Sequence, residues 1–139
     1  MNALRRKTAL LLAGPALTAL SLTTAAPASA QTSMTITSVF LGSSSSVSVS
    51  GEYACDGEGY PTAVSVIVDN TENGNRVGGS SQYAPVCDGN VHSFRVTANK
   101  RLEPVPVSFS RGDTVLVQAY LANSRTGRNI VEDWDYFTL

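Results

Sequence analysis

Apolar and polar side chains alternate with a period of two along most of the chain beyond residue 30. The clearest stretch covers residues 46–55, where Val47, Val49, Tyr53 and Cys55 share one parity and serines occupy most of the other. This alternation is typical of a β-strand that has one face in a hydrophobic core and one face in water. Because no stretch beyond residue 30 has the 3.6-residue period of an amphipathic helix, we predict an all-β fold.

Turn-forming residues divide the pattern into seven or eight short segments with a spacing of roughly ten residues. Residues 62–69 have apolar side chains on both faces, which predicts a central strand, and Asn73-Gly74 predicts a hairpin turn after it. Residues 104–107 contain two prolines, which lack amide donors, and are expected at a sheet edge. The other predicted strands are 34–41, 46–55, 75–83, 91–97, 114–121 and 129–139. This organisation is typical of an immunoglobulin-like antiparallel β-sandwich of seven or eight strands.

The two cysteines, Cys55 and Cys87, are each followed by Asp-Gly. This pair favours a tight turn, because Asp caps its own backbone and Gly tolerates positive φ, so the thiols are expected at matching corners of the fold. The C-x-x-C spacing of redox-active cysteines is absent, and we predict a structural Cys55–Cys87 disulfide. A bridge that closes a loop of about 33 residues contributes roughly 3.7 kcal/mol to stability in the chain-entropy model.

Residues 1–30 have the pattern of a cleaved secretory signal peptide. Three basic residues at 5–7 come first, an apolar stretch follows, and Ala-Ser-Ala at 28–30 fits the cleavage motif. A membrane anchor is disfavoured, because the apolar run is shorter than the ~20 residues of a membrane span and contains Pro15. We therefore expect a secreted, extracellular protein with one β-sandwich domain, residues 31–139, and no membrane anchor after cleavage.

The predicted mature domain is mildly acidic. Three of the ten basic residues lie in the signal segment, which leaves seven basic and eleven acidic residues and a net charge of −4. Nucleic acid and anionic lipid both require clustered Lys and Arg, so neither is expected as a partner. We expect a monomer whose partner is an extracellular protein, a glycan or a small molecule.

Three motifs span most of the predicted domain. They are Gly51-x-Tyr53-x-Cys55, Cys87-Asp88-Gly89-x-x-His92-x-Phe94 and Arg111-Gly112-x-x-Val115-x-Val117-x-Ala119-x-Leu121. Together they resemble an uncharacterised family of small secreted actinobacterial immunoglobulin-like proteins with one disulfide, a domain of unknown function. Phe94 stands where that family is expected to have tryptophan. The resemblance implies a fold and a compartment, and it implies no active site.

Size and export are also similar to those of the enediyne-binding apoproteins of actinomycetes, which are immunoglobulin-like. Those proteins have two disulfides, and their cysteine motifs are not found in this chain. The similarity is therefore one of architecture.

No catalytic residues are predicted. The chain has one histidine, His92, and neither a G-x-S-x-G elbow nor an H-E-x-x-H motif. His92 follows Asp88 by four residues and is a conceivable base, but its strand position favours a packed or hydrogen-bonded histidine. Glu132, Asp133 and Asp135 are neighbours in sequence and need not face one another across a cleft, as paired catalytic carboxylates do. We therefore expect that the protein is not an enzyme and has no cofactor.

Two groups of acidic turn residues have alternative interpretations. Asp56, Glu58 and Asp88 are a weak candidate for a Ca²⁺ site if the bridge brings the two Asp-Gly corners together. Turn formation explains both Asp-Gly pairs and is favoured, so no metal is expected. The Arg-Gly-Asp sequence at 111–113 matches the tripeptide that integrins recognise, but it also fits a turn before the strand 114–121, which we predict.

The last predicted strand carries the only tryptophan, Trp134, on the same parity as Tyr136 and opposite to Val131 and Phe137. Because both faces of this strand have large side chains, either the strand contains a bulge or one aromatic residue is exposed. An exposed Trp134 or Tyr136 would stack on a sugar or a flat apolar ligand, which makes these two residues the candidate ligand-facing pair. The core is the favoured place for Trp134, because a small domain needs large buried side chains.

Three functions follow from these patterns. The first is a secreted, non-enzymatic binding or interaction module at the cell surface or in the medium. The second is a small-molecule carrier that resembles the enediyne apoproteins and holds its ligand in a cleft between the sheets. The third is a minor hydrolase. A flat face with exposed aromatic residues favours the first, a deep apolar pocket the second, and a histidine–carboxylate contact at a cleft the third.

Overall fold

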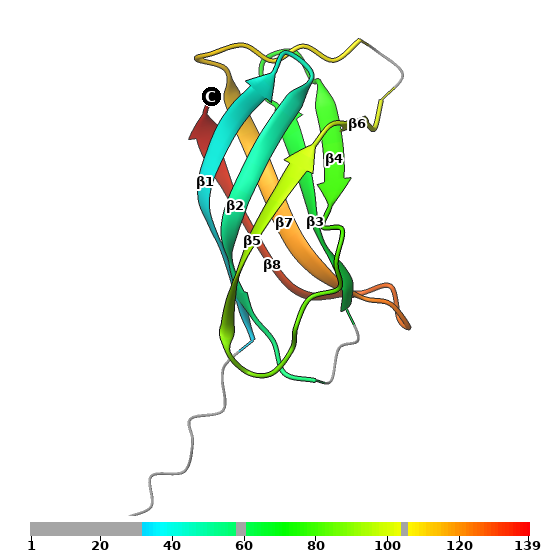
Figure 1. Ribbon diagram of the computed structural model, residues 1–139. Coiled ribbons are helices and arrows are strands. Elements are labelled where there is room, and N and C mark those ends of the chain that lie inside the picture. The colour runs from blue at the N-terminus through cyan, green and yellow to red at the C-terminus, as the bar shows by residue number, and fades with distance from the viewer. Residues whose placement is uncertain (1–31, 58–60, 104–105) are drawn as a thin grey trace, which may run out of the picture.

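The computed structural model describes residues 32–57, 61–103 and 106–139, and within them the chain forms eight β-strands and no helix. Figure 1 shows the long strands stacked in two layers. The predicted all-β fold is therefore confirmed. The strands are β1 (Ser33–Ser43), β2 (Ser46–Ala54), β3 (Pro61–Asn70), β4 (Arg76–Ser80), β5 (Val91–Ala98), β6 (Lys100–Arg101), β7 (Thr114–Asn123) and β8 (Asn129–Thr138).

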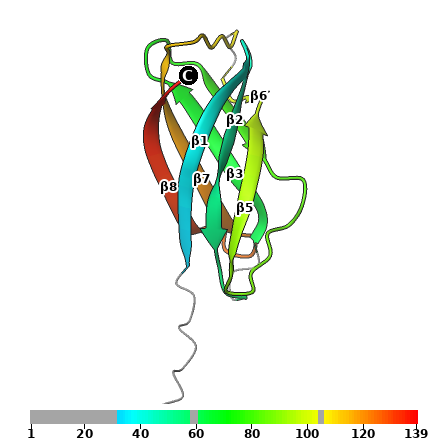
Figure 2. The same cartoon turned by 60° about the vertical axis from the view of Figure 1, so that its left-hand side comes forward.

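The eight strands form two antiparallel sheets. One has the order β1-β2-β5, and the other has the order β6-β4-β3-β7-β8. In a constant-type immunoglobulin sandwich the first, second, fourth and fifth strands form one sheet and the third, sixth and seventh form the other. When the two-residue β6 is left out, this chain differs in one strand, because β4 lies beside β3 in the larger sheet. Figure 2 shows the three-stranded sheet in front of the larger one, so the predicted β-sandwich, with β3 in the interior of its sheet, is confirmed.

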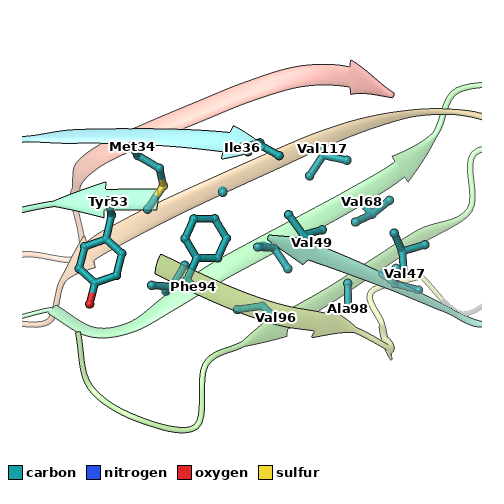
Figure 3. Close-up of a cluster of buried hydrophobic side chains, with 14 of the residues drawn as sticks. Met34, Ile36, Val47, Val49, Tyr53, Val68, Phe94, Val96, Ala98 and Val117 are labelled. Carbon is teal, nitrogen blue, oxygen red and sulfur yellow. The ribbon is translucent and has the colours of Figure 1, made fainter. Parts of the chain in front are cut away.

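The core lies between the sheets, and nine of the eighteen described residues in its buried cluster are valines. Buried and less buried positions alternate without interruption from Val64 onward in β3 and along β7 up to Leu121, so each strand has one row in the core. Figure 3 shows Val47, Val68 and Val117 in this space, and Val47 comes from the opposite sheet. The alternation that predicted the strands therefore also predicts which side chains are buried.

A glycine in β2 makes room for the largest aromatic ring of the neighbouring strand. A Cβ atom at Gly51 would lie 2.6 Å from the ring of Phe94 and would collide with the backbone oxygen of Thr35. Phe94 is buried in the core cluster (Figure 3). Any side chain at position 51 would therefore displace either this ring or β1.

The strand predicted at 75–83 is too long, because β4 ends at Ser80. The next residue, Ser81, still donates its N–H to Val64 O at 2.8 Å, but the Val64 N–H is donated to Ser81 Oγ at 3.0 Å in place of a backbone oxygen, and the ladder ends there. The described edge strand is β6, which pairs with β4, and the segment predicted at the edge, 104–107, is described only in part. Pro106 and Val107 are not in a strand, and residues 104–105 lie outside the described part of the chain. A segment with two prolines has too few amide donors for a ladder.

The segment after these prolines contributes to the core instead. Phe109 is 2% exposed, and its N–H donates to Ser44 O at 2.7 Å, which ties the loop to the turn between β1 and β2. Periodicity did not point to Phe109, because it lies in a loop. The loop therefore closes one end of the sandwich.

The turn between β3 and β4 is longer than Asn73-Gly74 predicts. Gly74 has a φ of 71°, as expected, but five residues separate the two strands. The side chain of Asn70, which is 1% exposed, organises them: its Oδ1 accepts hydrogen bonds from the N–H groups of Glu72 and Asn73 at 2.9 and 3.3 Å. A buried amide that replaces backbone bonding partners explains why a larger turn is stable.

The predicted disulfide is confirmed. Cys55 and Cys87 are bonded, with their Cα atoms 4.6 Å apart. The bridge links the end of β2 to the loop before β5, two neighbouring strands of one sheet, whereas the antibody bridge joins the two sheets. It therefore anchors the loop 81–90 rather than the two layers.

Replacing both cysteines by alanine is expected to lower the free energy of unfolding by about 3 to 4 kcal/mol, because the unfolded chain loses the constraint on a long loop. Urea denaturation of the oxidised wild type and the double variant measures the difference. Reduced wild type is the matched control and should behave like the double variant. Equal midpoints for all three would contradict a stabilising bridge.

Candidate ligand-binding face

The two candidate ligand-facing residues lie on the outer face of β8, at the edge of the five-stranded sheet. Trp134 is 61% exposed and Tyr136 is 57% exposed. The expectation that Trp134 is in the core is therefore wrong, and the alternative, exposure of an aromatic residue, is correct. The strand keeps its alternation without a bulge at this point, and Phe137 lies on the side that packs against the core.

Two aspartates occupy the inward positions next to the tryptophan. Asp133 pairs with Ala119 and Asp135 with Val117, and both partners are buried. Residues directly opposite one another in an antiparallel pair share a face, so both aspartates are on the face of β8 that is turned toward the core, where Asp133 is half-buried and Asp135 is exposed at the strand edge. The Asp133 Oδ2 accepts the N–H of Ile36 in β1 at 2.8 Å. Inward charges at a sheet edge hinder the addition of another strand.

The outward residues of β7 and β8 form a mixed aromatic and polar surface. Trp134 lies opposite Gln118, and Tyr120 lies opposite Glu132. The Glu132 Oε2 accepts hydrogen bonds from Gln118 Nε2 at 3.3 Å and from Asn129 Nδ2. The Gln118 amide therefore lies opposite Trp134 and bonds to the Glu132 carboxylate, two residues along β8 on the same face. Sequence reasoning identified the two aromatic residues and missed the amides, whose place depends on the register of the two strands.

The same face of the sheet continues toward the opposite edge, where it contains a groove. The groove has a volume of about 460 Å³, and its lining includes Ile67, Gly78, Leu102 and Tyr120. Gly78 pairs with Ile67, and Ile67 pairs with Gln118, so the groove and Trp134 share one sheet face. The Gly-Gly pair at 78–79 was the available signal, but the sequence does not say which of the two glycines faces outward.

A second candidate region is a cleft between β5 and the segment 81–85. It has a volume of about 430 Å³ and is lined by Tyr53, Val64, Phe94 and the 82% exposed Tyr83, among others. It lies where the two sheets separate beside the free edge of β5. This is the place at which a carrier would hold a small molecule between the sheets.

The disulfide corner is organised by His92. Its Nε2 lies 2.8 Å from Asp88 Oδ1, and its ring stacks on Tyr53 with centroids 5.6 Å apart. The Tyr53 hydroxyl accepts the N–H of Val86 at 3.1 Å. The expectation of a packed, hydrogen-bonded histidine is therefore confirmed. Neither His92 nor Asp88 lines the cleft beside β5.

The hydrogen bond from His92 is the main reason why the pKa of Asp88 lies well below its usual range, and the Asn90 N–H, at 2.9 Å from Asp88 Oδ1, adds to the effect. Both donors stabilise the ionised carboxylate. The Asp88 carboxylate therefore stabilises the loop before β5 by accepting these hydrogen bonds.

The calcium candidate cannot be assembled in full, because Glu58 lies outside the described residues. The other two members, Asp56 and Asp88, each follow a cysteine of the bridge. Among the residues that the structure describes, no group of three or more His, Cys, Asp or Glu side chains is placed to hold a metal ion.

The Arg-Gly-Asp sequence forms the predicted turn. Gly112 has a φ of 93°, and its N–H donates to Leu139 O at 2.7 Å. The Asp113 carboxylate accepts hydrogen bonds from Asn70 Nδ2 at 2.6 Å and from the Ser110 N–H at 2.9 Å. The aspartate therefore bonds to its own domain and joins the turn after β3 to the end of β8.

The predicted signal peptide, residues 1–30, lies outside the described part of the chain. The described residues include no helix that is long and apolar enough to cross a membrane. A disulfide in this β-domain is compatible with an extracellular location.

Comparison of the chain with protein-family models, curated proteins and solved structures gives no match. The family resemblance and the function therefore stay predictions.

Replacing Asp88 by asparagine is expected to reduce the acid sensitivity of the fold. A carboxyl with a lowered folded-state pKa stabilises the protein above its unfolded pKa, about 3.9, and this contribution is lost as the pH falls toward the folded value. The wild type should therefore be more stable than Asp88→Asn at neutral pH, and the gap should close in acid. Urea denaturation at a series of pH values measures the gap.

Asp56→Asn is the matched control, because it removes a carboxylate from the same corner and keeps the Asp88–His92 contact. It should leave the acid profile close to that of the wild type. A gap between wild type and Asp88→Asn that is independent of pH would contradict the assignment.

Proposed function

We propose that the chain is a secreted, non-enzymatic binding module whose ligand-binding surface is the outer face of β7 and β8. The single observation that supports this function is the exposure of Trp134 and Tyr136 together on a strand of a hydrogen-bonded sheet. Trp and Tyr bring large contact areas with few rotatable bonds, so they lose little conformational entropy when they bind. The exposed pair, which the sheet holds in place, is therefore a preorganised binding surface.

The surroundings of the pair also support binding rather than simple exposure. Gln118, directly opposite Trp134, and Glu132, which accepts from Gln118 and Asn129, provide ordered hydrogen-bonding groups on the same face. Binding sites typically combine an apolar surface with a few placed polar groups that fix the orientation of the ligand. Export to the cell surface or medium is proposed from the signal-type first thirty residues and from the disulfide.

When native culture medium is passed over immobilised mature protein, the wild type is expected to retain the ligand. The Trp134→Ala variant is expected to lose this retention. The medium is separated into polysaccharide, protein and small-molecule fractions, and the retained material is identified by native mass spectrometry. Because Trp134 is the only tryptophan, its fluorescence reports directly on the same site in solution.

Phe40→Ala is the matched control for this experiment. Phe40 is 58% exposed, close to the value for Trp134, but it lies on β1 in the other sheet. It should leave retention unchanged. If binding survives Trp134→Ala, or if Phe40→Ala abolishes it, the proposed surface is wrong.

A small-molecule carrier is the second candidate, and the cleft beside β5 is the observation that favours it. Its volume of about 430 Å³ lies in the range of roughly 300 to 1,000 Å³ that is usual for small-molecule sites. The hydrolase alternative has less support, because the His92–Asp88 contact holds the bridge corner and does not line this cleft.

If the protein is a carrier, Tyr83→Ala should release a small molecule that co-purifies with the wild type, because Tyr83 lines the cleft and is exposed at its side. Trp134→Ala should retain that molecule. Native mass spectrometry of the three proteins separates the two functions. Wild-type protein that purifies without any bound small molecule would argue against the carrier.

A further inference from the structure

We infer that the ligand of this face is a neutral glycan chain that lies across the strands, from Trp134 on β8 to the groove beside Gly78 on β4. The inference rests on the proposed function, because it names the ligand class of the same face. It adds the groove as a second contact region and sets the direction of the bound chain.

A row of directly paired residues connects the two ends. Trp134 pairs with Gln118, Gln118 with Ile67, and Ile67 with Gly78. Neighbouring strands lie about 4.8 Å apart, so the three steps span roughly 14 Å. A path of this length suits several linked sugars and is too long for a single ring.

The absence of a side chain at Gly78 makes room for Leu102 at the far end of this path. A Cβ atom at this position would lie 3.2 and 3.4 Å from the two methyl carbons of Leu102, which forms a wall of the groove. Ile67 and Tyr120 also line it. At about 460 Å³ the groove is within the range of sites for small rings. It therefore accepts one end of a chain that begins on the tryptophan.

The near end has the two kinds of group that a sugar requires. A sugar ring has flat C–H faces, which pack on aromatic rings, and a rim of hydroxyl groups, which both donate and accept hydrogen bonds. Trp134 and Tyr136 are two residues apart on one strand, roughly 6.7 Å, and provide two such platforms. Gln118 and Glu132 provide planar amide and carboxylate groups beside them for neighbouring hydroxyls.

The charges of the face favour a neutral chain. Asp69 and Arg76, on adjacent outer positions of β3 and β4, form an ion pair at 3.1 Å. Glu132 on β8 and Lys100 on β6 have opposite signs at the two ends. The predicted mature domain has a net charge of −4, which disfavours sulfated or uronic acid chains. The combination of aromatic platforms, amides and balanced charge is complementary to an uncharged polyol.

The test titrates the mature, disulfide-bonded protein with neutral oligosaccharides of glucan, xylan, mannan and chitin, from disaccharides to hexasaccharides. Trp134 fluorescence and calorimetry measure binding. We expect affinity to rise with chain length. Gly78→Val, which fills the groove, should weaken binding of the hexasaccharide at least about tenfold. It should leave binding of the disaccharide on Trp134 within about twofold.

Two further variants support the comparison. Gly57→Ala is the matched glycine control, because its Cβ would make only an ordinary contact, 3.9 Å from Cys87 O. Valine is favoured in strands, and at position 78 its Cβ meets only a side chain, so Gly78→Val is expected to fold. Leu102→Ala removes the opposite wall and gives an independent measurement: it should also weaken the hexasaccharide selectively.

Each outcome supports or overturns the inference. No binding in the panel, affinity that does not depend on length, or equal loss for short and long chains in Gly78→Val would overturn it. Tighter, salt-dependent binding of an anionic polysaccharide would do the same. If the panel fails while Trp134→Ala still abolishes retention from native medium, only the ligand class is wrong. If Trp134→Ala leaves that retention intact, the proposed function itself is wrong.

Discussion

Burial of the valine rows between the two sheets determines the face on which every neighbouring side chain lies. Val117 and Ala119 point into the core, so their partners on β8, Asp135 and Asp133, lie on the inner side and Trp134 lies outside. A slip of one residue would bury Trp134. It would also turn Phe137 outward and break the bond from Asp133 to the Ile36 N–H. Moving Val131 and Phe137 away from the core against which they pack would lose apolar burial, so the observed register is favoured.

The contacts that stabilise the disulfide corner and the proposed binding surface lie in different sheets. The disulfide, the Tyr53–His92 stack and the Asp88–His92 contact all hold the end of β2 and the loop before β5. The aromatic pair and the groove lie on the outer face of the five-stranded sheet. Because the valine core separates these regions, substitutions on the outer face of β8 are expected to change binding with little effect on the bridge corner. Asp133 adds a structural contact on the same strand, because its carboxylate accepts the Ile36 N–H of β1.

The pattern of the sequence predicted most of the strands, and its errors have physical causes. Residues 46–55, 62–69 and 114–121 alternate clearly and agree with β2, β3 and β7 within a few residues. The strand predicted at 75–83 is too long, because at Ser81 the side-chain hydroxyl, and not the backbone oxygen, accepts the Val64 N–H, and the ladder ends. Periodicity also missed Phe109, which reaches the core from a loop. Trp134 was assigned to the core from its size alone, although the parity of β8 already placed it opposite to Val131 and Phe137.

The sequence by itself determined the all-β class, the pairing of Cys55 with Cys87, and the division of each strand into two parities, because these depend on local periodicity and on the residue types alone. Only the tertiary structure decided which parity of β8 is exposed and which residues of β3, β4 and β7 stand beside it. Those choices depend on the register between strands that are far apart in the chain. The row from Trp134 to Gly78 is therefore a property of the sheet, and no stretch of the sequence contains it.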